Sequence, residues 1–229
     1  MSHRSSRANR TLAKTTRAAL LLCLGVAALP STSSAAAQAP DWTPASAKPA
    51  SAQAGLFAAW VIASGDNHGM AFVIVDKINA EVLVFHPDGR LRGAAPALLG
   101  LGHGDDSVPG IGQRKLSTIT PKERTTPAGR FVASLGNDFG KKNILWIDYD
   151  AALSLHRVIP TKSRLHRLAT PSILDNRASF GCINVPAKFF DAVVEPSFKG
   201  KKGIVYILPE SRSIQAAFPT YAVTAPPSN

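Results

Sequence analysis

The sequence predicts a mostly β domain with one short helix that directly follows its second cysteine. Three observations lead to this prediction. Short runs of β-branched and aromatic residues recur along the chain, and Gly, Pro, Asn and Asp separate them, as in strands joined by tight turns. Pro186 to Val194 has the pattern of a helix with proline at its first turn. With 229 residues, 45% of them hydrophobic, the chain is long enough to bury one sizeable core.

Residues 1–37 have the order of a secretory signal peptide. Five basic residues and no acidic residue precede the apolar run Ala18 to Leu29, and a small polar stretch with Ala35 to Ala37 as the expected cleavage triplet follows it. The apolar run is shorter than the roughly 20 residues that a membrane span requires. We therefore expect cleavage, export to the periplasm or cell envelope, and no stable membrane span after processing.

The distribution of charge argues against nucleic acid as a partner. The formal net charge is +11, and loss of residues 1–37 removes five basic groups and no acidic group, which leaves +6. The remaining basic residues are scattered, without an aromatic-interleaved stripe or a nucleic-acid-binding motif. Such a surplus favours an anionic cell envelope through long-range attraction. We expect no nucleic acid partner.

Composition also divides the mature chain into three parts. Residues 38–55 are rich in Ala, Ser and Pro and predict a flexible linker, residues 56–210 predict the folded domain, and residues 211–229 predict a C-terminal tail. Leu56 to Ala63 is apolar and fits a short helix or a first strand equally well.

Several apolar runs within the domain predict strands. They are Ala71–Val75, Ala80–Phe85, the end of Thr125–Ser134, Asn143–Ile147, Ala151–Val158 and Gly203–Leu208. Alternation places Ala152, Ser154 and His156 on one face of their strand. Pro96 to Gly112 is a glycine-rich loop, and Thr161 to Leu174 is interpreted as a basic, irregular insertion.

Cys182 is the one thiol expected in the mature protein, because Cys23 lies in the apolar run of the signal peptide. A lone cysteine forms no internal disulfide, so it is either a small buried residue or a nucleophile. Gly181 lets the backbone turn sharply, so that neighbouring N–H groups can point at an oxyanion. A nucleophile also needs a base. His156 near the end of a strand is the preferred candidate, and His166, in a basic run, is the alternative.

These residues occur in an order that is similar to a known family. Thr126-Pro-Ala-Gly-Arg-Phe131, then His156, then Ser179-Phe-Gly-Cys-Ile-Asn184 resemble the L,D-transpeptidase catalytic domain, also called the YkuD domain, over roughly Met70 to Leu208. The resemblance implies a β-sandwich or barrel in which Cys182 attacks the carbonyl of the third residue of a peptidoglycan stem peptide. A thioester then forms and D-alanine leaves.

The resemblance implies further roles around Cys182. His156 would activate the thiol and later an amine acceptor on a stem peptide or an envelope protein. The N–H groups of Phe180, Gly181 and Cys182 correspond to the oxyanion hole, although the family usually has histidine at the position of Phe180. Ser179 and the asparagine of the motif, Asn184, would contact substrate. Peptidoglycan is the implied partner, and no metal or organic cofactor is implied.

Two questions stay open at the level of single residues. Arg177 either binds a substrate carboxylate or forms an ion pair with Asp175 that stiffens the turn. His166 lies 16 residues before Cys182, close to the family's usual spacing, whereas His156 lies 26 residues before it. We favour His156, because loops absorb insertions at little cost and a catalytic base needs a rigid support.

Two other functions also stay open. Water as the acceptor would make the protein an L,D-carboxypeptidase or a peptidoglycan amide hydrolase. A domain that keeps the fold but has lost catalytic activity would be a noncatalytic cell-wall-binding domain. A metalloenzyme built on Gly102 to Asp106 is disfavoured, because no paired-histidine helix or other ligand cluster accompanies this segment.

Overall fold

A computed structural model describes residues 50–137 and 143–221. The predicted signal peptide, linker residues 38–49 and residues 222–229 of the predicted tail lie outside the described residues. Within the described ranges, no helix combines the length and the apolar character that a membrane crossing requires.

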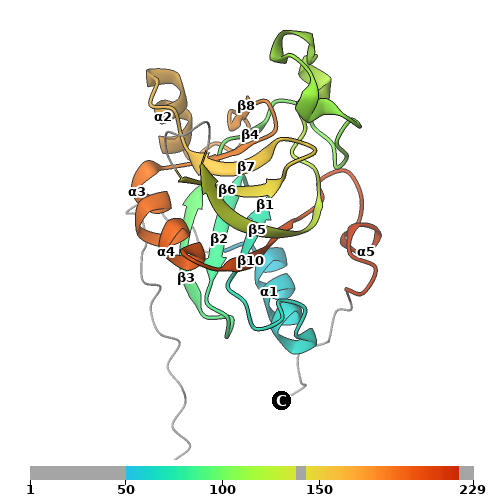
Figure 1. Ribbon diagram of the computed structural model, residues 1–229, viewed down its shortest axis with the longest axis vertical. Helices are drawn as coiled ribbons and strands as arrows, with labels where there is room; N and C mark the ends of the chain where they lie inside the picture. The colour runs from blue at the N-terminus through green and yellow to red at the C-terminus, as the bar shows by residue number, and fades with distance from the viewer. Residues whose placement is uncertain (1–49, 138–142, 222–229) are drawn as a thin grey trace, which may run out of the picture. The chain divides into compact units, whose positions relative to one another are not determined.

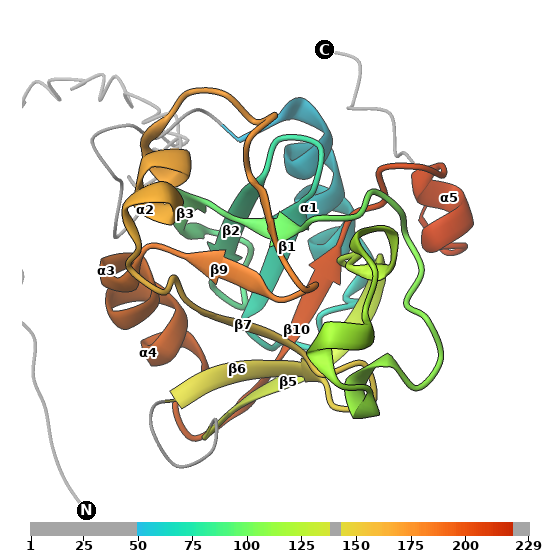
Figure 2. The same cartoon turned by 90° about the horizontal axis from the view of Figure 1, so that it is seen from above.

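Eight strands form one curved sheet in the order β3-β2-β1-β10-β5-β6-β7-β9 (Figures 1 and 2). They are β1 Phe72–Asp76, β2 Glu81–Phe85, β3 Leu91–Pro96, β5 Gly129–Asn137, β6 Asn143–Asp148, β7 Leu153–Arg157, β9 Ile183–Val185 and β10 Lys202–Ile207. The pairs β1 with β10 and β7 with β9 are parallel, and the others are antiparallel. Leu98, just after β3, exchanges backbone hydrogen bonds of 2.8 and 2.9 Å with Asn184 in β9. The two edges of the sheet therefore meet and nearly close it.

The central strands bury both of their faces, as near-continuous apolar runs require. In β1, Val73 and Val75 pack in one apolar cluster, and Phe72 and Ile74 pack in another. The first cluster includes a helical run made of α3 Ala187–Phe189, the π-helical turn Phe190–Val194 and α4 Glu195–Phe198. Pro186 precedes this run as its N-cap. The predicted mostly β fold, with a short helix after the cysteine, is confirmed.

Helix α1, Ala52–Ser64, packs in the second cluster and resolves the ambiguity of Leu56 to Ala63 in favour of a helix. It also begins inside the predicted linker, so the boundary at residue 55 is wrong. The reason is local, because the Ser51 hydroxyl accepts the N–H of Ala54 at 3.1 Å and caps the first turn.

The start of the predicted C-terminal tail belongs to the folded domain. Helix α5, Ile214–Ala217, follows β10, and the rings of Phe218 and Tyr221 lie 4.8 and 5.3 Å from the ring of Phe57. Both aromatic side chains are buried, so residues 211–221 complete the second cluster.

The predicted irregular insertion contains a helix, α2, Lys162–Ala169. Thr161 caps it by accepting the N–H of Arg164 at 3.3 Å, and Leu168 packs against Leu98 and Val158. Lys162 and His166 are exposed, whereas Arg164 donates to Oδ1 of Asn184 at 3.3 Å and Arg167 donates to the carbonyl of Asp175. The expectation of an irregular loop is wrong here, because one buried leucine, Leu168, together with the hydrogen bonds of Arg164 and Arg167, docks this short helix. The glycine-rich loop includes a two-residue strand, β4 Leu99–Gly100, which pairs with β8 Arg177–Ser179.

Candidate active site

Cys182 lies in the turn that joins β8 to β9. Gly181 has a φ of 130°, a conformation that side-chain-bearing residues rarely adopt, and a Cβ at this position would lie 2.8 Å from the carbonyl oxygen of Thr125. Only glycine fits there without displacing the neighbouring backbone. The shape of the turn thus requires glycine at position 181.

Three side chains hold the backbone of this turn. The hydroxyl of Ser179 and the Nδ2 amide of Asn184 both donate to the carbonyl of Cys182, at 2.7 and 3.0 Å. The hydroxyl of buried Thr126 donates to the carbonyl of Gly181 at 2.7 Å. The position of Cys182 is therefore fixed through its main chain, and none of these three bonds involves the thiol.

These contacts change several roles that the sequence predicted. Ser179 and Asn184 are 5% and 1% exposed, and both side chains support the turn. The N–H of Gly181 donates to the Ser179 hydroxyl at 3.1 Å, so it is not available as an oxyanion donor. The N–H groups of Phe180 and Cys182 stay as the oxyanion candidates.

The half-buried thiol of Cys182 faces one side of β7, which is the neighbour of β9. Its Sγ donates to the carbonyl of Ala152 at 3.3 Å and accepts from the hydroxyl of Ser154 at 3.5 Å. The sequence analysis did not single out Ser154 or Ala152 as site residues. Their signal was the alternation that puts both on the face of His156.

His156 provides the third contact to the thiol, a side-chain hydrogen bond. Its Nδ1 lies 2.8 Å from the carbonyl of Arg157, and because a carbonyl only accepts, Nδ1 carries a proton. Nε2 is then the nitrogen that can take a proton from the thiol. The structure therefore brings His156 to Cys182, whereas His166 lies exposed on α2.

Two opposing effects act on the pKa of the Cys182 thiol. Burial raises this pKa, and the hydrogen bonds from His156 and Ser154, together with the charge of His156, lower it. The lowering effects prevail, so the pKa lies below the ordinary value of a cysteine. A larger fraction of the thiol is therefore ionised near neutral pH than in a free cysteine.

Arg177 lies on β8 but its guanidinium points into a buried ionic cluster. It pairs with Glu210 and donates to the carbonyl of Lys77 at 3.2 Å. The predicted ion pair with Asp175 is wrong, since Asp175 accepts the hydroxyl of Thr170 at 3.1 Å instead. With its side chain 10% exposed, Arg177 is not presented for a substrate carboxylate either.

Phe180 is 40% exposed beside the thiol, and the guanidinium carbon of Arg124 lies 3.9 Å from the centre of its ring. This cation–π contact places a positive charge at the position where the resembled family has histidine. Sequence analysis missed Arg124, because the two residues are far apart in the chain and nothing in the sequence links them.

Asp105, in the segment considered for a metal, accepts the ammonium of Lys77 at 2.7 Å, and His103 lies 3.3 Å from Glu210. Across the described parts of the chain, no group of three or more His, Cys, Asp or Glu side chains is arranged to hold a metal ion.

Comparison with known proteins gave matches to solved structures only. No family model and no curated protein matches the chain. The helical cell shape determining protein Pgp2 from Campylobacter jejuni, as its K307A mutant, is 16% identical with a TM-score of 0.43, over 71% of this chain and 58% of that one. An L,D-transpeptidase from Xylanimonas cellulosilytica is 16% identical with a TM-score of 0.36, over 60% of each chain.

LD transpeptidase LdtMt1, in complex with imipenem, is 13% identical with a TM-score of 0.32, over 60% of this chain and 58% of that one. This chain thus spans less than two thirds of each of these three proteins. The reaction has to be argued from the residues around Cys182.

Proposed function

We propose that this protein is an exported cysteine L,D-transpeptidase that acts on peptidoglycan stem peptides. One observation carries the proposal: a half-buried thiol on a fixed turn is hydrogen-bonded by a histidine whose other nitrogen is held by a backbone carbonyl. This is the arrangement of a nucleophile with an oriented base. The motif resemblance supplies the substrate class.

In the first half-reaction, Nε2 of His156 takes the thiol proton and Sγ of Cys182 attacks the carbonyl carbon of the third stem residue. The N–H groups of Phe180 and Cys182 are the proposed donors to the oxyanion that forms. When the tetrahedral intermediate collapses, the amide bond to D-alanine breaks and the amine leaves with the proton from His156. A thioester on Cys182 results.

In the second half-reaction, an acceptor amine gives a proton to His156 and attacks the thioester. The new amide forms, and the sulfur leaves as the thiolate and recovers the proton. Ser154, which donates to Sγ at 3.5 Å, stabilises the thiolate both at the start and at the end of this cycle.

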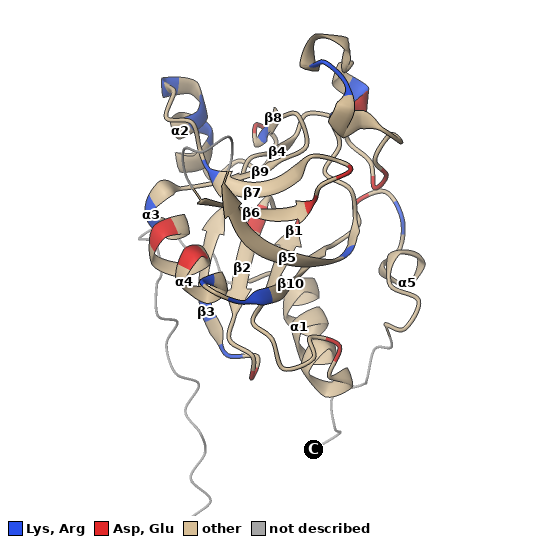
Figure 3. Cartoon of the chain, viewed as in Figure 1, with Lys and Arg blue, Asp and Glu red and all other residues tan. Residues whose placement is uncertain are grey.

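The distribution of charge suits a peptide that carries carboxylates. Basic residues lie on α2 and, with Glu123 between them, on the stretch that contains the 3₁₀ turns Ile111–Gln113, Leu116–Thr118 and Pro121–Glu123, to either side of β8 (Figure 3). A surplus of positive charge raises the local concentration of an anionic substrate through long-range attraction. Together with the expected signal peptide, this supports action in the cell envelope.

Mass spectrometry of purified tetrapeptide muropeptides incubated with the protein tests the proposal. We expect a crosslinked dimer that has lost D-alanine with the wild type, none with Cys182→Ala, and a strong reduction with His156→Gln. The matched control His166→Gln should keep the wild-type rate. Formation of tripeptide without dimer would show that the protein hydrolyses the stem peptide and does not crosslink it. Absence of both products would contradict the proposal.

A further inference from the structure

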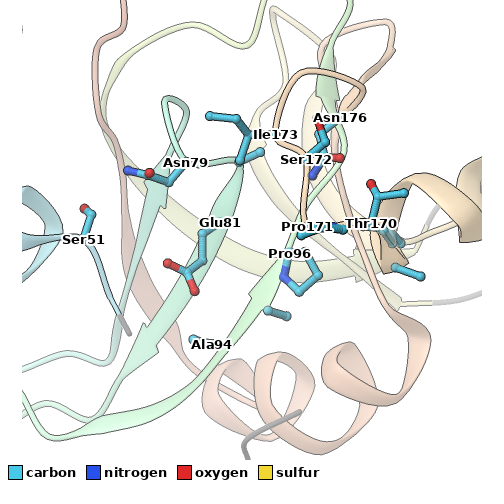
Figure 4. Close-up of a pocket in the computed structure, with 14 residues that line it drawn as sticks. Ser51, Asn79, Glu81, Ala94, Pro96, Thr170, Pro171, Ser172, Ile173 and Asn176 are labelled. Atoms are coloured by element: carbon cyan, nitrogen blue, oxygen red, sulfur yellow. The ribbon is translucent and has the colours of Figure 1, made fainter. Parts of the chain in front are cut away.

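The cavity between the turn before β2, the end of β3 and the segment after α2 does not suit an anionic stem peptide (Figure 4). Its only charged lining residue among the described ones is Glu81, which already interacts with another group of the protein. No Lys, Arg or His of the described ranges lines it. An anchor for a carboxylate of the peptide therefore has to be sought at the cysteine turn.

Arg124 lies on a segment that runs against the cysteine turn, directly after the 3₁₀ turn Pro121–Glu123. The next two residues contact Gly181: the carbonyl oxygen of Thr125 would lie 2.8 Å from a Cβ there, and the Thr126 hydroxyl donates to its carbonyl. The guanidinium carbon of Arg124 lies 3.9 Å from the centre of the Phe180 ring. A positive charge is thus held at the residue whose N–H is a proposed oxyanion donor, two positions before the nucleophile.

Hydrogen bonds fix one side of the Arg124 guanidinium. Nε and Nη2 both donate to the carbonyl of Ile119, at 3.2 and 3.0 Å, which uses the side that these two nitrogens share. The opposite end, Nη1 with the second proton of Nη2, makes no hydrogen bond to a described residue. Two N–H groups side by side on a guanidinium can bind a carboxylate through two parallel hydrogen bonds.

The carboxylate nearest to Arg124 in the chain has other partners. Glu123 pairs with Arg114 at 2.7 Å and accepts the N–H of Thr120 at 2.8 Å. Within the described ranges, no Asp or Glu forms an ion pair with Arg124, which is partly exposed. The fold therefore positions this cation beside the thiol without neutralising it.

We propose that Arg124 binds a carboxylate of the stem peptide next to the scissile bond, an inference that rests on the proposed function. The peptide offers two such groups. One is the C-terminal carboxylate of the D-alanine that leaves, and the other is a carboxylate on the side chain of the third residue. Either would accept from Nη1 and Nη2, while the oxyanion accepts from the N–H groups of Phe180 and Cys182. Arg124 then determines specificity for a charged stem.

Binding of tetrapeptide stems to Cys182→Ala, measured by isothermal titration calorimetry, tests this proposal without turnover. One peptide has both carboxylates free, one has a C-terminal carboxamide, and one has a carboxamide on the side chain of the third residue. We expect one of the two amides to bind at least about tenfold more weakly than the free peptide, because it loses a charge-assisted contact. The weaker amide identifies the carboxylate. Equal binding of all three peptides, or no binding of the free peptide, would overturn the proposal.

Variants in the Cys182→Ala background assign the preference to Arg124. Arg124→Gln should abolish it, and Arg124→Lys should retain part of it, because an ammonium pairs with a carboxylate but lacks the planar fork. Lys122→Gln, which removes an exposed charge from the same segment, is the matched control and should keep the full preference. A merely structural role of Arg124 would weaken all three peptides alike. A preference that persists in Arg124→Gln would therefore contradict the assignment.

Turnover of tetrapeptide muropeptides by the wild type separates this inference from the proposed function. Crosslinking together with equal binding of the three peptides would keep the transpeptidase and refute the role of Arg124. A carboxylate preference that depends on Arg124, without any product, would keep the carboxylate site and refute the transpeptidase.

Discussion

The turn that carries Cys182 and the ionic cluster around Lys77 are neighbouring polar networks with opposite outcomes. Thr126 belongs to both, because its carbonyl accepts from the Lys77 ammonium at 2.8 Å and its hydroxyl donates to the carbonyl of Gly181. In the cluster, the ammonium of Lys77 is fully hydrogen-bonded. In the turn, the short hydrogen bonds go to backbone carbonyls and not to the sulfur.

The cluster around Lys77 joins distant parts of the chain. The fully buried ammonium donates to Asp105 and to the carbonyl of Gly104, each at 2.7 Å, in addition to Thr126, which engages all three of its protons. Asp105 also accepts the backbone N–H groups of Glu210 and Ser211 at 2.8 Å. These bonds anchor the chain just after β10 and stabilise the fold.

In the cysteine turn, the short hydrogen bonds involve the backbone and not the functional group of the cysteine. Its hydrogen bonds of 2.7 to 3.0 Å go to the carbonyls of Gly181 and Cys182, whereas the contacts of the sulfur to Ala152 and Ser154 are 3.3 and 3.5 Å. The strong hydrogen bonds thus fix the backbone of Gly181 and Cys182, and only the longer contacts involve the sulfur. Loss of a buried charge in the cluster should therefore affect mainly stability, and loss of the sulfur should affect mainly activity.

The largest expected effect is that of Cys182→Ala on activity. Without the sulfur no thioester forms, so product formation should fall by at least about a thousandfold. The free energy of unfolding should change by no more than about 1 kcal/mol, because a small side chain replaces a half-buried one. Muropeptide turnover and urea unfolding measure the two quantities, and wild-type turnover in the variant would contradict the account.

Lys77→Met should have the largest effect on stability. It leaves Asp105 buried without its cation, which costs about 3–5 kcal/mol in comparable buried pairs. Urea unfolding measures the loss. Lys199→Met, at an exposed position, is the matched control and should stay within about 0.5 kcal/mol of the wild type. Equal losses in the two variants would show that the buried cluster has no special weight.

Gly181→Ala should have a smaller effect, of about 1–3 kcal/mol, through strain at positive φ and the contact with Thr125. Gly110→Ala is a matched control, since Gly110 also has a positive φ, of 72°, but no atom lies within 4 Å of the added Cβ. The Gly181 variant should lose more stability in urea unfolding, and its muropeptide turnover should fall as well. The reverse order of stabilities would refute the close approach of Thr125.

The smallest expected effect is a dependence of stability on pH. Burial raises the pKa of Asp105, but hydrogen bonds from Lys77, Ser211 and Glu210 outweigh it and hold this pKa well below its usual range. The pKa of an unfolded Asp is about 3.9. Because the pKa of Asp105 is lower in the folded state, its ionised carboxylate stabilises the fold at pH values above about 3.9, and this stabilisation is lost as the pH falls toward the folded-state pKa.

The unfolding free energy contributed by Asp105 should thus be constant from about pH 7 to 5 and decline below about pH 4. Urea unfolding between these values measures the slope. Asp105→Asn has no charge to lose at this position and should show a shallower decline. If the unfolding free energy falls equally steeply with pH in the wild type and in Asp105→Asn, other carboxylates cause the loss of stability in acid.

Much of the fold was predictable because its signals are local. Runs such as Ala71–Val75 and Gly203–Leu208 are apolar throughout and form central strands. The period of two along β7 places His156 on the face of Ala152 and Ser154, and His156 contacts the thiol. Spacing to the cysteine alone favours His166, so His156 stays a prediction as the base. The same period contained Ser154 and Ala152, although their contact with the thiol depends on the parallel pairing of β7 with β9.

The rest depends on contacts between residues far apart in the chain. Phe218 and Tyr221 stand singly among small and polar residues, and contacts with the rings of α1 and with Tyr206 in β10 make them part of a core. Arg177 precedes the cysteine motif in the sequence, but its ion-pair partner, Glu210, lies 33 residues further along the chain and was not predicted. Such pairings follow from the topology of the sheet and leave no pattern in the sequence.

The rate at which iodoacetamide alkylates Cys182, measured against pH, tests the central claim most directly. The Cys182 peptide is quantified by mass spectrometry, so Cys23 does not interfere. We expect the alkylation rate to reach half of its maximum at a pH below about 8.5, the pKa of a free thiol. This midpoint should move to higher pH in His156→Gln but not in His166→Gln. A midpoint at or above the free value, or one that is the same in all three proteins, would contradict the central claim.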